Sequence, residues 1–275
     1  MNKLKAGFIG FMPFTAKGDE FYDYLKEYAE IGYKGFENGG FLFREGNVEE
    51  NLARVKGYGI EPIDVGLMSF PGRPEPSLDE VIRQANQIGV KRVVAFNNLA
   101  SMYRFGARPE PASYDEVMRE IEDFEEKATR LKAEGIDFMY HNHDTEFTQC
   151  YRGIPQLQLI AANSENLTFE LDCGWAAYAG ADPVALIGQL GKRISVLHIK
   201  DYIDKIVEYR GMPNVKVPQF TTVGTGKLDL YGCLKAGVEQ NIEWAIVEQD
   251  FPNILQHKDS LTAAYLNMKE TGLVE

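Results

Sequence analysis

Residues 113–147 read SYDEVMREIEDFEEKATRLKAEGIDFMYHNHDTEF, a helical pattern followed by an apolar run that ends in polar residues. Ser113 with Glu116 three residues later is a capping-box pattern, which predicts the start of a helix. Gly135 predicts its end, just after Ala133, because glycine commonly terminates helices. The next run, Asp137 to Asn142, has the length of a buried strand. The stretch therefore predicts a helix that returns the chain to a strand with a polar end.

The same alternation continues on both sides of this stretch. Strands are predicted at Lys5–Gly10, Lys34–Glu37, Pro62–Leu67, Arg92–Phe96, Asp137–Asn142, Leu167–Asp172, Ser195–Lys200 and Glu243–Val247. Helices are predicted at Glu20–Ile31, Val48–Tyr58, Ser77–Ile88, Ser113–Ala133, Ile154–Ala162, Pro183–Leu190, Leu230–Gln240 and Ser260–Lys269. The stretches 98–111 and 202–225 are expected to be irregular loops. Alternating strands and helices form a parallel sheet with helices outside it. Eight such units in roughly 250 residues are typical of a closed barrel, so we predict an α/β fold, a single (βα)₈ TIM barrel over residues 1–275.

The composition restricts the partners of the chain. Hydrophobic residues make up 44% of it and charged residues 25%, which are ordinary values for a globular protein. The net charge of −12 argues against nucleic acid and anionic membranes as partners but allows a small substrate. Three cysteines without a CxxC pair fit a reducing compartment. The basic and apolar start is too short for a signal peptide, so we expect a cytoplasmic protein.

Polar side chains cluster at the C-terminal ends of the predicted strands, where barrel enzymes place their active sites. Three of the four histidines are among them. The candidates are Glu37 in GFENGG, His141, His143 and Glu146 in YHNHDTEF, Asp172 and Trp175 in ELDCGW, His198 and Lys200 in LHIKDY, and Glu248 in VEQD. Imidazole and carboxylate ligands together suit Mn, Zn or Co, and a carboxylate-rich set suits Mg. The pattern therefore predicts one divalent metal ion at the mouth of the barrel.

Each candidate has a simpler explanation when it is taken alone. A single aspartate at a strand end is usually a helix N-cap, and Lys200 next to Asp201 can be a local ion pair of little energetic value. The glycines of VGTGK are too few for a phosphate-binding loop. The stronger signal is that four consecutive strands each present a metal-competent residue toward one axis. Strand geometry also places residues two apart on the same side, so that each strand end offers two inward groups.

At these residues the sequence resembles the xylose isomerase-like TIM barrel superfamily, in its sugar phosphate isomerase/epimerase branch. The matching motifs are YHNHDTEF, LDCGWAAYAGADP, VLHIKDY, VGTGKLDL and AIVEQD, in the order and spacing of that family. The resemblance implies one divalent metal ion held at the ends of strands five to eight, with Asp172, His198 and Glu248 matching three ligands. The strand-five ligand of the family is usually glutamate, whereas this chain has His141. Either His141 is the ligand, or Glu146 reaches in from the loop, or the ion has one protein ligand fewer.

The resemblance implies carbonyl chemistry on a small polyhydroxylated substrate. Our first hypothesis is a sugar or sugar phosphate isomerase or epimerase that acts through an enediolate. The alternative is a dehydratase of the inosose or dehydroshikimate type, which the two histidines of HNH favour because they can supply an acid for the departing hydroxyl. A phosphodiesterase like endonuclease IV shares the barrel, but the few histidines and the acidity argue against it.

The resemblance also assigns roles at the mouth. Glu248, His143 and Glu146 are candidates for the base, and Lys200 for neutralising the enediolate. Glu37 and Trp175 are expected to contact the substrate, Trp175 by covering the apolar face of a sugar ring. Arg210 is a candidate for binding a phosphate. Family members often pair, so a homo-oligomer is also expected.

Overall fold

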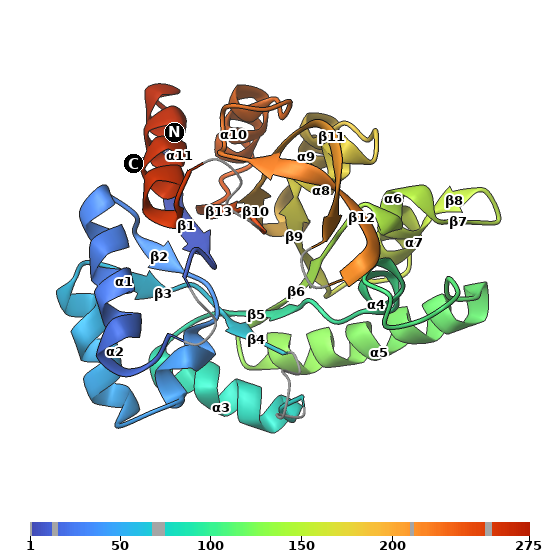
Figure 1. Ribbon diagram of the computed structural model, residues 1–275. Helices are drawn as coiled ribbons and strands as arrows, with labels where there is room; N and C mark the ends of the chain where they lie inside the picture. Colours follow the sequence, from blue (N-terminus) through green and yellow to red (C-terminus); the bar gives the residue numbers. More distant parts are fainter. Residues whose placement is uncertain (1, 13–15, 68–74, 210–211, 251–254) are drawn as a thin grey trace.

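The computed structural model describes residues 2–12, 16–67, 75–209, 212–250 and 255–275, and it shows a ring of parallel strands enclosed by helices (Figure 1). The strands of the ring are β1 (Lys5–Ile9), β2 (Gly35–Phe36), β3 (Glu61–Pro62), β4 (Val65–Gly66), β5 (Arg92–Ala95), β6 (Asp137–His141), β9 (Thr168–Asp172), β10 (Ile194–Ile199) and β13 (Trp244–Glu248). Their order is β3-β2-β1-β13-β10-β9-β6-β5-β4, and every neighbouring pair is parallel. The predicted barrel is confirmed.

The predicted third strand is interrupted at Ile63 and Asp64, so that it forms the two short strands β3 and β4. β3 pairs with β2 and β4 pairs with β5, and together they nearly close the ring. The backbone carbonyl of Asp64 accepts a hydrogen bond from the Gly39 amide at 2.8 Å, and its Oδ1 accepts one from the Asn38 amide at 3.0 Å. Asp64, which lies in the interruption, therefore fixes the turn that follows β2.

Helices cover the outside of the ring, as the sequence predicts (Figure 1). They are α1 (Gly18–Ile31), α2 (Val48–Gly57), α3 (Leu78–Ile88), α5 (Tyr114–Ala133), α7 (Gln156–Ala162), α9 (Pro183–Leu190), α10 (Leu230–Glu239) and α11 (His257–Glu270). The capping box of Ser113 and Glu116 is present, and the side chain of Ser77 caps α3. No helix in the described part of the chain is both long and apolar enough to cross a membrane.

The two expected irregular loops contain regular structure, so those two predictions are wrong. Residues 98–111 contain α4 (Leu99–Arg104), which begins with a capping box between Asn98 and Ser101. Residues 202–225 lie largely in an antiparallel hairpin of β11 (Asp201–Tyr209) and β12 (Met212–Thr221). The hairpin is regular because Val217 and Phe220 pack on Trp175 in a small separate core. Shorter elements elsewhere are 3₁₀ helices at Gly39–Phe43 and Gly191–Arg193, α6 (Thr145–Thr148), β7 (Cys150–Tyr151), β8 (Ile154–Pro155) and α8 (Cys173–Tyr178).

The interior of the ring has an apolar layer near the start of the strands. This layer consists of Ile63, Val94, Met139, Val196, Trp244 and Ile246. Trp244 fills it so completely that a Cβ on Gly35 would lie 2.6 Å from the indole ring, which explains the glycine in β2. Successive inward residues lie two apart along a strand, so the next inward layer carries the polar candidates.

Candidate metal centre

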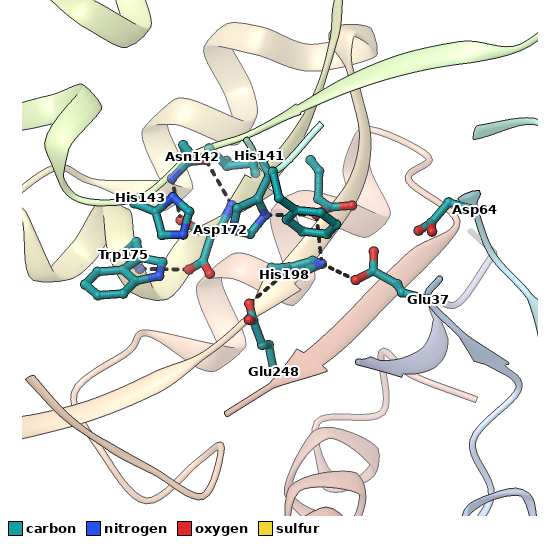
Figure 2. A network of polar contacts seen from close by, with 12 residues as sticks. Glu37, Asp64, His141, Asn142, His143, Asp172, Trp175, His198 and Glu248 are labelled. Carbon is teal, nitrogen blue, oxygen red and sulfur yellow. Dashed lines mark hydrogen bonds and ion pairs between the residues drawn. The ribbon is translucent and has the colours of Figure 1, made fainter. Parts of the chain in front are cut away.

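Four side chains from four adjacent strands converge at the mouth of the barrel (Figure 2). His141 ends β6, Asp172 ends β9, His198 lies in β10 and Glu248 ends β13. Each offers one ligand atom, and these atoms all lie within 4.8 Å of one another. Two imidazoles and two carboxylates at this spacing can hold a divalent transition metal ion.

Asp172 provides a test of whether a cation fits this cluster. Its Oδ1 accepts a hydrogen bond from the amide of Trp175 at 2.8 Å, as an N-cap does. Its Oδ2 is buried without a hydrogen-bond partner in the described structure, and Lys200 Nζ lies 3.4 Å away. Burial raises the pKa of Asp172 to about 6, although Lys200 opposes this effect. A buried carboxylate oxygen without a donor fits a bound metal ion well.

Each of the two imidazoles in the cluster has a buried carboxylate beside it. His141 Nδ1 lies 2.8 Å from Glu170 Oε1, and His198 Nε2 lies 3.0 Å from Glu37 Oε2. Burial lowers the pKa of His141 well below its usual value, which keeps this ring neutral. For His198, burial lowers the pKa, but the negative charges of Glu170 and Glu37 outweigh burial and raise it well above the usual value.

Lys200 supplies a buried positive charge next to the cluster. Its Nζ lies 2.9 Å from Glu248 Oε2 and 3.0 Å from Asp250 Oδ2. The same nitrogen is 5.2 Å from the ring centroid of Trp175 and 5.0 Å from that of Phe220, within cation–π range. Burial lowers the pKa of Lys200, but Asp250 and Glu248 outweigh burial and raise it well above its usual value. Lys200 is therefore a fixed cation that holds Glu248 in place.

His143 and Glu146 lie beside the four converging side chains. The ring of His143 packs against Phe105 and Trp175, with centroids 5.0 and 5.6 Å away, and its Nδ1 has no hydrogen-bond partner among the described residues. Burial lowers the pKa of His143 to about 3, so the ring is neutral at ordinary pH. Glu146 accepts hydrogen bonds from the Tyr140 hydroxyl and the His143 amide, both at 3.0 Å.

Glu37 and Trp175, two of the residues expected to contact the substrate, are both buried. Glu37 is buried against His198 rather than open to the mouth. Trp175 is fully buried, and Phe220 packs on its ring at a centroid distance of 5.0 Å. Arg210 lies outside the described residues.

Three acidic residues near the centre receive no role from the sequence. Glu170 and Asp64 are fully buried, and Asp250 is largely buried and pairs with Lys200. The sequence does mark Asp64 and Glu170 as unusual, because each is an acidic residue inside an apolar strand, in PIDVGL and TFELD. The alternative pairing of Lys200 with Asp201 does not occur, because Asp201 accepts hydrogen bonds from the amides of residues 202, 224, 226 and 228 instead.

Most of the chain is similar in sequence to known proteins. A family model described as "Xylose isomerase-like TIM barrel" matches residues 25–263. An inosose dehydratase from Clostridium beijerinckii is 25% identical over 255 residues, which cover 87% of this chain and 85% of the relative.

Solved structures with the same fold are more distant in sequence. The probable 3-DHS dehydratase AsbF from Bacillus anthracis has a TM-score of 0.74 at 15% identity, covering 97% of this chain and 99% of that one. A sugar phosphate isomerase/epimerase from Parabacteroides distasonis has a TM-score of 0.68 at 20% identity, with coverage of 98% and 96%. The IOLI protein, whose structure contains a zinc atom, has a TM-score of 0.68 at 18% identity, with coverage of 98% for both chains.

The family model covers most of the ring and all four strands that carry the cluster. The buried histidine and carboxylate cluster is consistent with a divalent metal site. Its position at the C-terminal ends of barrel strands is where barrel enzymes place their chemistry. Together with the matched fold, this identifies the chain as a member of the xylose isomerase-like TIM barrel family.

Proposed function

We propose that this enzyme is a metal-dependent dehydratase that removes water from a polyhydroxylated ketone of the inosose class. The observation that carries the proposal is the convergence of His141, Asp172, His198 and Glu248 beside a neutral histidine, His143. Carbonyl activation and proton transfer are the two elements that an elimination next to a carbonyl requires.

Two observations favour the dehydratase over the isomerase or epimerase that is our first hypothesis. The inosose dehydratase from C. beijerinckii is similar over most of its length and most of this chain. In addition, epimerases of the family use a glutamate at strand five as one member of an acid/base pair, and this chain has His141 there. A plain two-glutamate epimerase mechanism is therefore less suited to this chain.

The ion is proposed to be held by His141, Asp172, His198 and Glu248. This set of two imidazoles and two carboxylates suits Mn, Zn or Co better than Mg, which prefers oxygen ligands. When bound, a divalent ion polarises the substrate carbonyl and lowers the cost of removing a proton from the adjacent carbon. Glu146 is proposed to support His143 through the backbone hydrogen bond at 3.0 Å rather than to bind the ion.

His143 is proposed to carry the proton. Its neutral ring takes the proton from the carbon next to the carbonyl, a carbon–carbon double bond forms, and the bond to the β-hydroxyl breaks. The same ring returns the proton to the departing oxygen, which leaves as water. Lys200 keeps Glu248 ionised and in position through the contact of 2.9 Å.

The charge of the mouth favours an uncharged substrate. Lys200 faces Asp172, Glu248 and Asp250, and Arg104 pairs with Asp144 at 2.6 Å. These two cations are already neutralised by carboxylates. An uncharged cyclic polyol ketone is therefore proposed rather than a sugar phosphate.

The test is NMR spectroscopy of the purified enzyme with inososes in D₂O, with Mn²⁺, Co²⁺ or Zn²⁺ supplied. A dehydratase produces signals of an unsaturated product and consumes substrate, because water is lost. Exchange of deuterium into the carbon position without water loss supports the isomerase or epimerase instead. The Asp172→Asn variant is the matched control, and it should show neither reaction.

A further inference from the structure

Glu170 lies directly behind His141, one position across the sheet. The two residues are register partners in the neighbouring strands β6 and β9, and both side chains are buried. His141 Nδ1 is 2.8 Å from Glu170 Oε1, within hydrogen-bond distance. An ionised Glu170 can only accept a hydrogen bond, so with Glu170 ionised Nδ1 carries the proton of the His141 ring. The other ring nitrogen, Nε2, is then left as the metal-binding atom of His141.

His198 has the opposite arrangement. Its Nε2 is 3.0 Å from Glu37 Oε2, while its Nδ1 is 2.9 Å from Glu248 Oε2. In the neutral ring that a metal ion requires, a proton on Nε2 facing Glu37 would leave Nδ1 as the metal-binding atom of His198. Glu170 faces Nδ1 of His141, while Glu37 and Glu170 both face Nε2 of His198, so these carboxylates favour opposite tautomers of the two rings.

We propose that Glu170 is a positioning residue that allows His141 to serve as the strand-five ligand in place of a glutamate. This inference rests on the metal site of the proposed function. A glutamate ligand brings one negative charge to an ion, and a neutral imidazole brings none. The carboxylate of Glu170 supplies this negative charge from behind the ligand, by accepting a hydrogen bond from the His141 ring. The hydrogen bond also makes His141 a stronger donor to the ion.

The surroundings of Glu170 agree with this assignment. Its Oε2 has no hydrogen-bond partner in the described parts of the chain, and its Oε1 also lies 3.1 Å from His198 Nε2. Glu170 thus contacts both ligand imidazoles, and burial together with the neighbouring acid Glu37 raises the pKa of Glu170 well above its usual value. A buried carboxylate is costly unless it is paired, and these rings are its partners here.

The first experiment measures Zn²⁺ and Co²⁺ affinity by calorimetry for wild type, Glu170→Gln, His141→Ala and the double variant. We expect Glu170→Gln to lower the affinity by about 10- to 100-fold, as removal of an outer carboxylate does. We expect a smaller effect of the same change in the His141→Ala background, because only the contact of Glu170 with His198 then remains. The d–d absorption of bound Co²⁺ should change as well.

The second experiment exchanges the two side chains. His141→Glu alone should bind metal poorly, because it places a second carboxylate against Glu170. The double variant His141→Glu/Glu170→Gln should bind metal more tightly than His141→Glu alone. It has a single carboxylate at these two positions, which now stands at the ligand position 141. Circular dichroism verifies that each variant is folded.

Glu120→Gln is the matched control, because Glu120 is a largely buried carboxyl that accepts the Leu99 amide outside the cluster. Its affinity for metal should equal that of wild type. If wild type binds metal and Glu170→Gln binds it equally well, the inference is overturned while the metal site stands. If wild type binds neither ion, the metal site fails and the inference fails with it.

Discussion

His143 shows how a single side chain gains its chemistry from its neighbours. Aromatic rings surround it, with Phe105 and Trp175 at centroid distances of 5.0 and 5.6 Å, and they exclude water from a nitrogen that has no hydrogen-bond partner in the described structure. A neutral imidazole with a free nitrogen can accept a proton; with a pKa of about 3 this ring is a weak base and, once protonated, a strong acid toward a departing oxygen. Its backbone is fixed separately, because Glu146 accepts the amide hydrogen of His143.

Replacement of His143 by alanine should therefore abolish the reaction without removing the ion. We expect a loss of about 10²- to 10⁴-fold in turnover, the usual contribution of a general base. Metal content should stay at the wild-type value, because His143 is not among the four converging side chains. Turnover measured beside metal analysis checks both statements, and near wild-type turnover would exclude His143 as the base.

The four converging residues could be singled out from the sequence because each lies at or near the end of an apolar run. Their surroundings could not. Glu170 faces His141 only because β6 and β9 pair in that register, and a sequence does not show which residues are paired across a sheet. Asp64 lies in the break between β3 and β4, and its contact with the Asn38 amide depends on how the chain folds there.

At the level of elements, the β11–β12 hairpin and the turn after it were the largest departure from expectation. Residues 203–209 of β11 are mostly exposed, so they lack the alternating apolar pattern that identifies a strand. The turn VGTGKL is organised by Asp201, which accepts hydrogen bonds from the amides of Gly224, Gly226 and Leu228 at 3.0, 2.8 and 2.9 Å. A Cβ on Gly226 would lie 2.3 Å from Asp201 Oδ1, so only glycine fits.

Asp201→Ala should destabilise the protein strongly. It leaves several backbone N–H groups without acceptors, each costing about 1–3 kcal/mol, so we expect a loss of at least about 3 kcal/mol in the free energy of unfolding. Asp204→Ala is the matched control in the same hairpin, because Asp204 is an exposed partner of Lys227 and should cost less than about 1 kcal/mol. Urea denaturation of both variants measures the difference, and equal losses would contradict this account of the turn.

For the whole molecule, the interior of the barrel carries more acidic than basic groups. Glu37, Asp64, Glu170 and Asp172 are all fully buried or nearly so, and Lys200 is the buried lysine beside them. Such a set is costly to bury without a cation. A divalent ion bound at this cluster should therefore stabilise the folded protein.

Metal should raise the melting temperature of the wild-type protein. At a free concentration 100 times the dissociation constant, a ligand that binds only the folded state stabilises it by about 2.7 kcal/mol. In a protein of this size that corresponds to roughly 5–10 °C. Calorimetric scans with Zn²⁺, Co²⁺ or EDTA measure the shift, and His198→Ala is the control that should show little of it. An identical melting temperature with and without these ions would contradict a metal site in the barrel.

The interruption of the third strand has a consequence for the ligands. The ring has a seam at Ile63 and Asp64, where β3 is joined to β2 only and β4 to β5 only. The four ligand-bearing strands, β6, β9, β10 and β13, are consecutive and lie on the other side of the ring from this seam. We expect changes in the circumference of the barrel to occur at the seam. The spacing of the four ligands is set by the pairing of their own strands, which is regular at the ligand end, although the β9–β10 pairing is irregular between Ile194 and Val196.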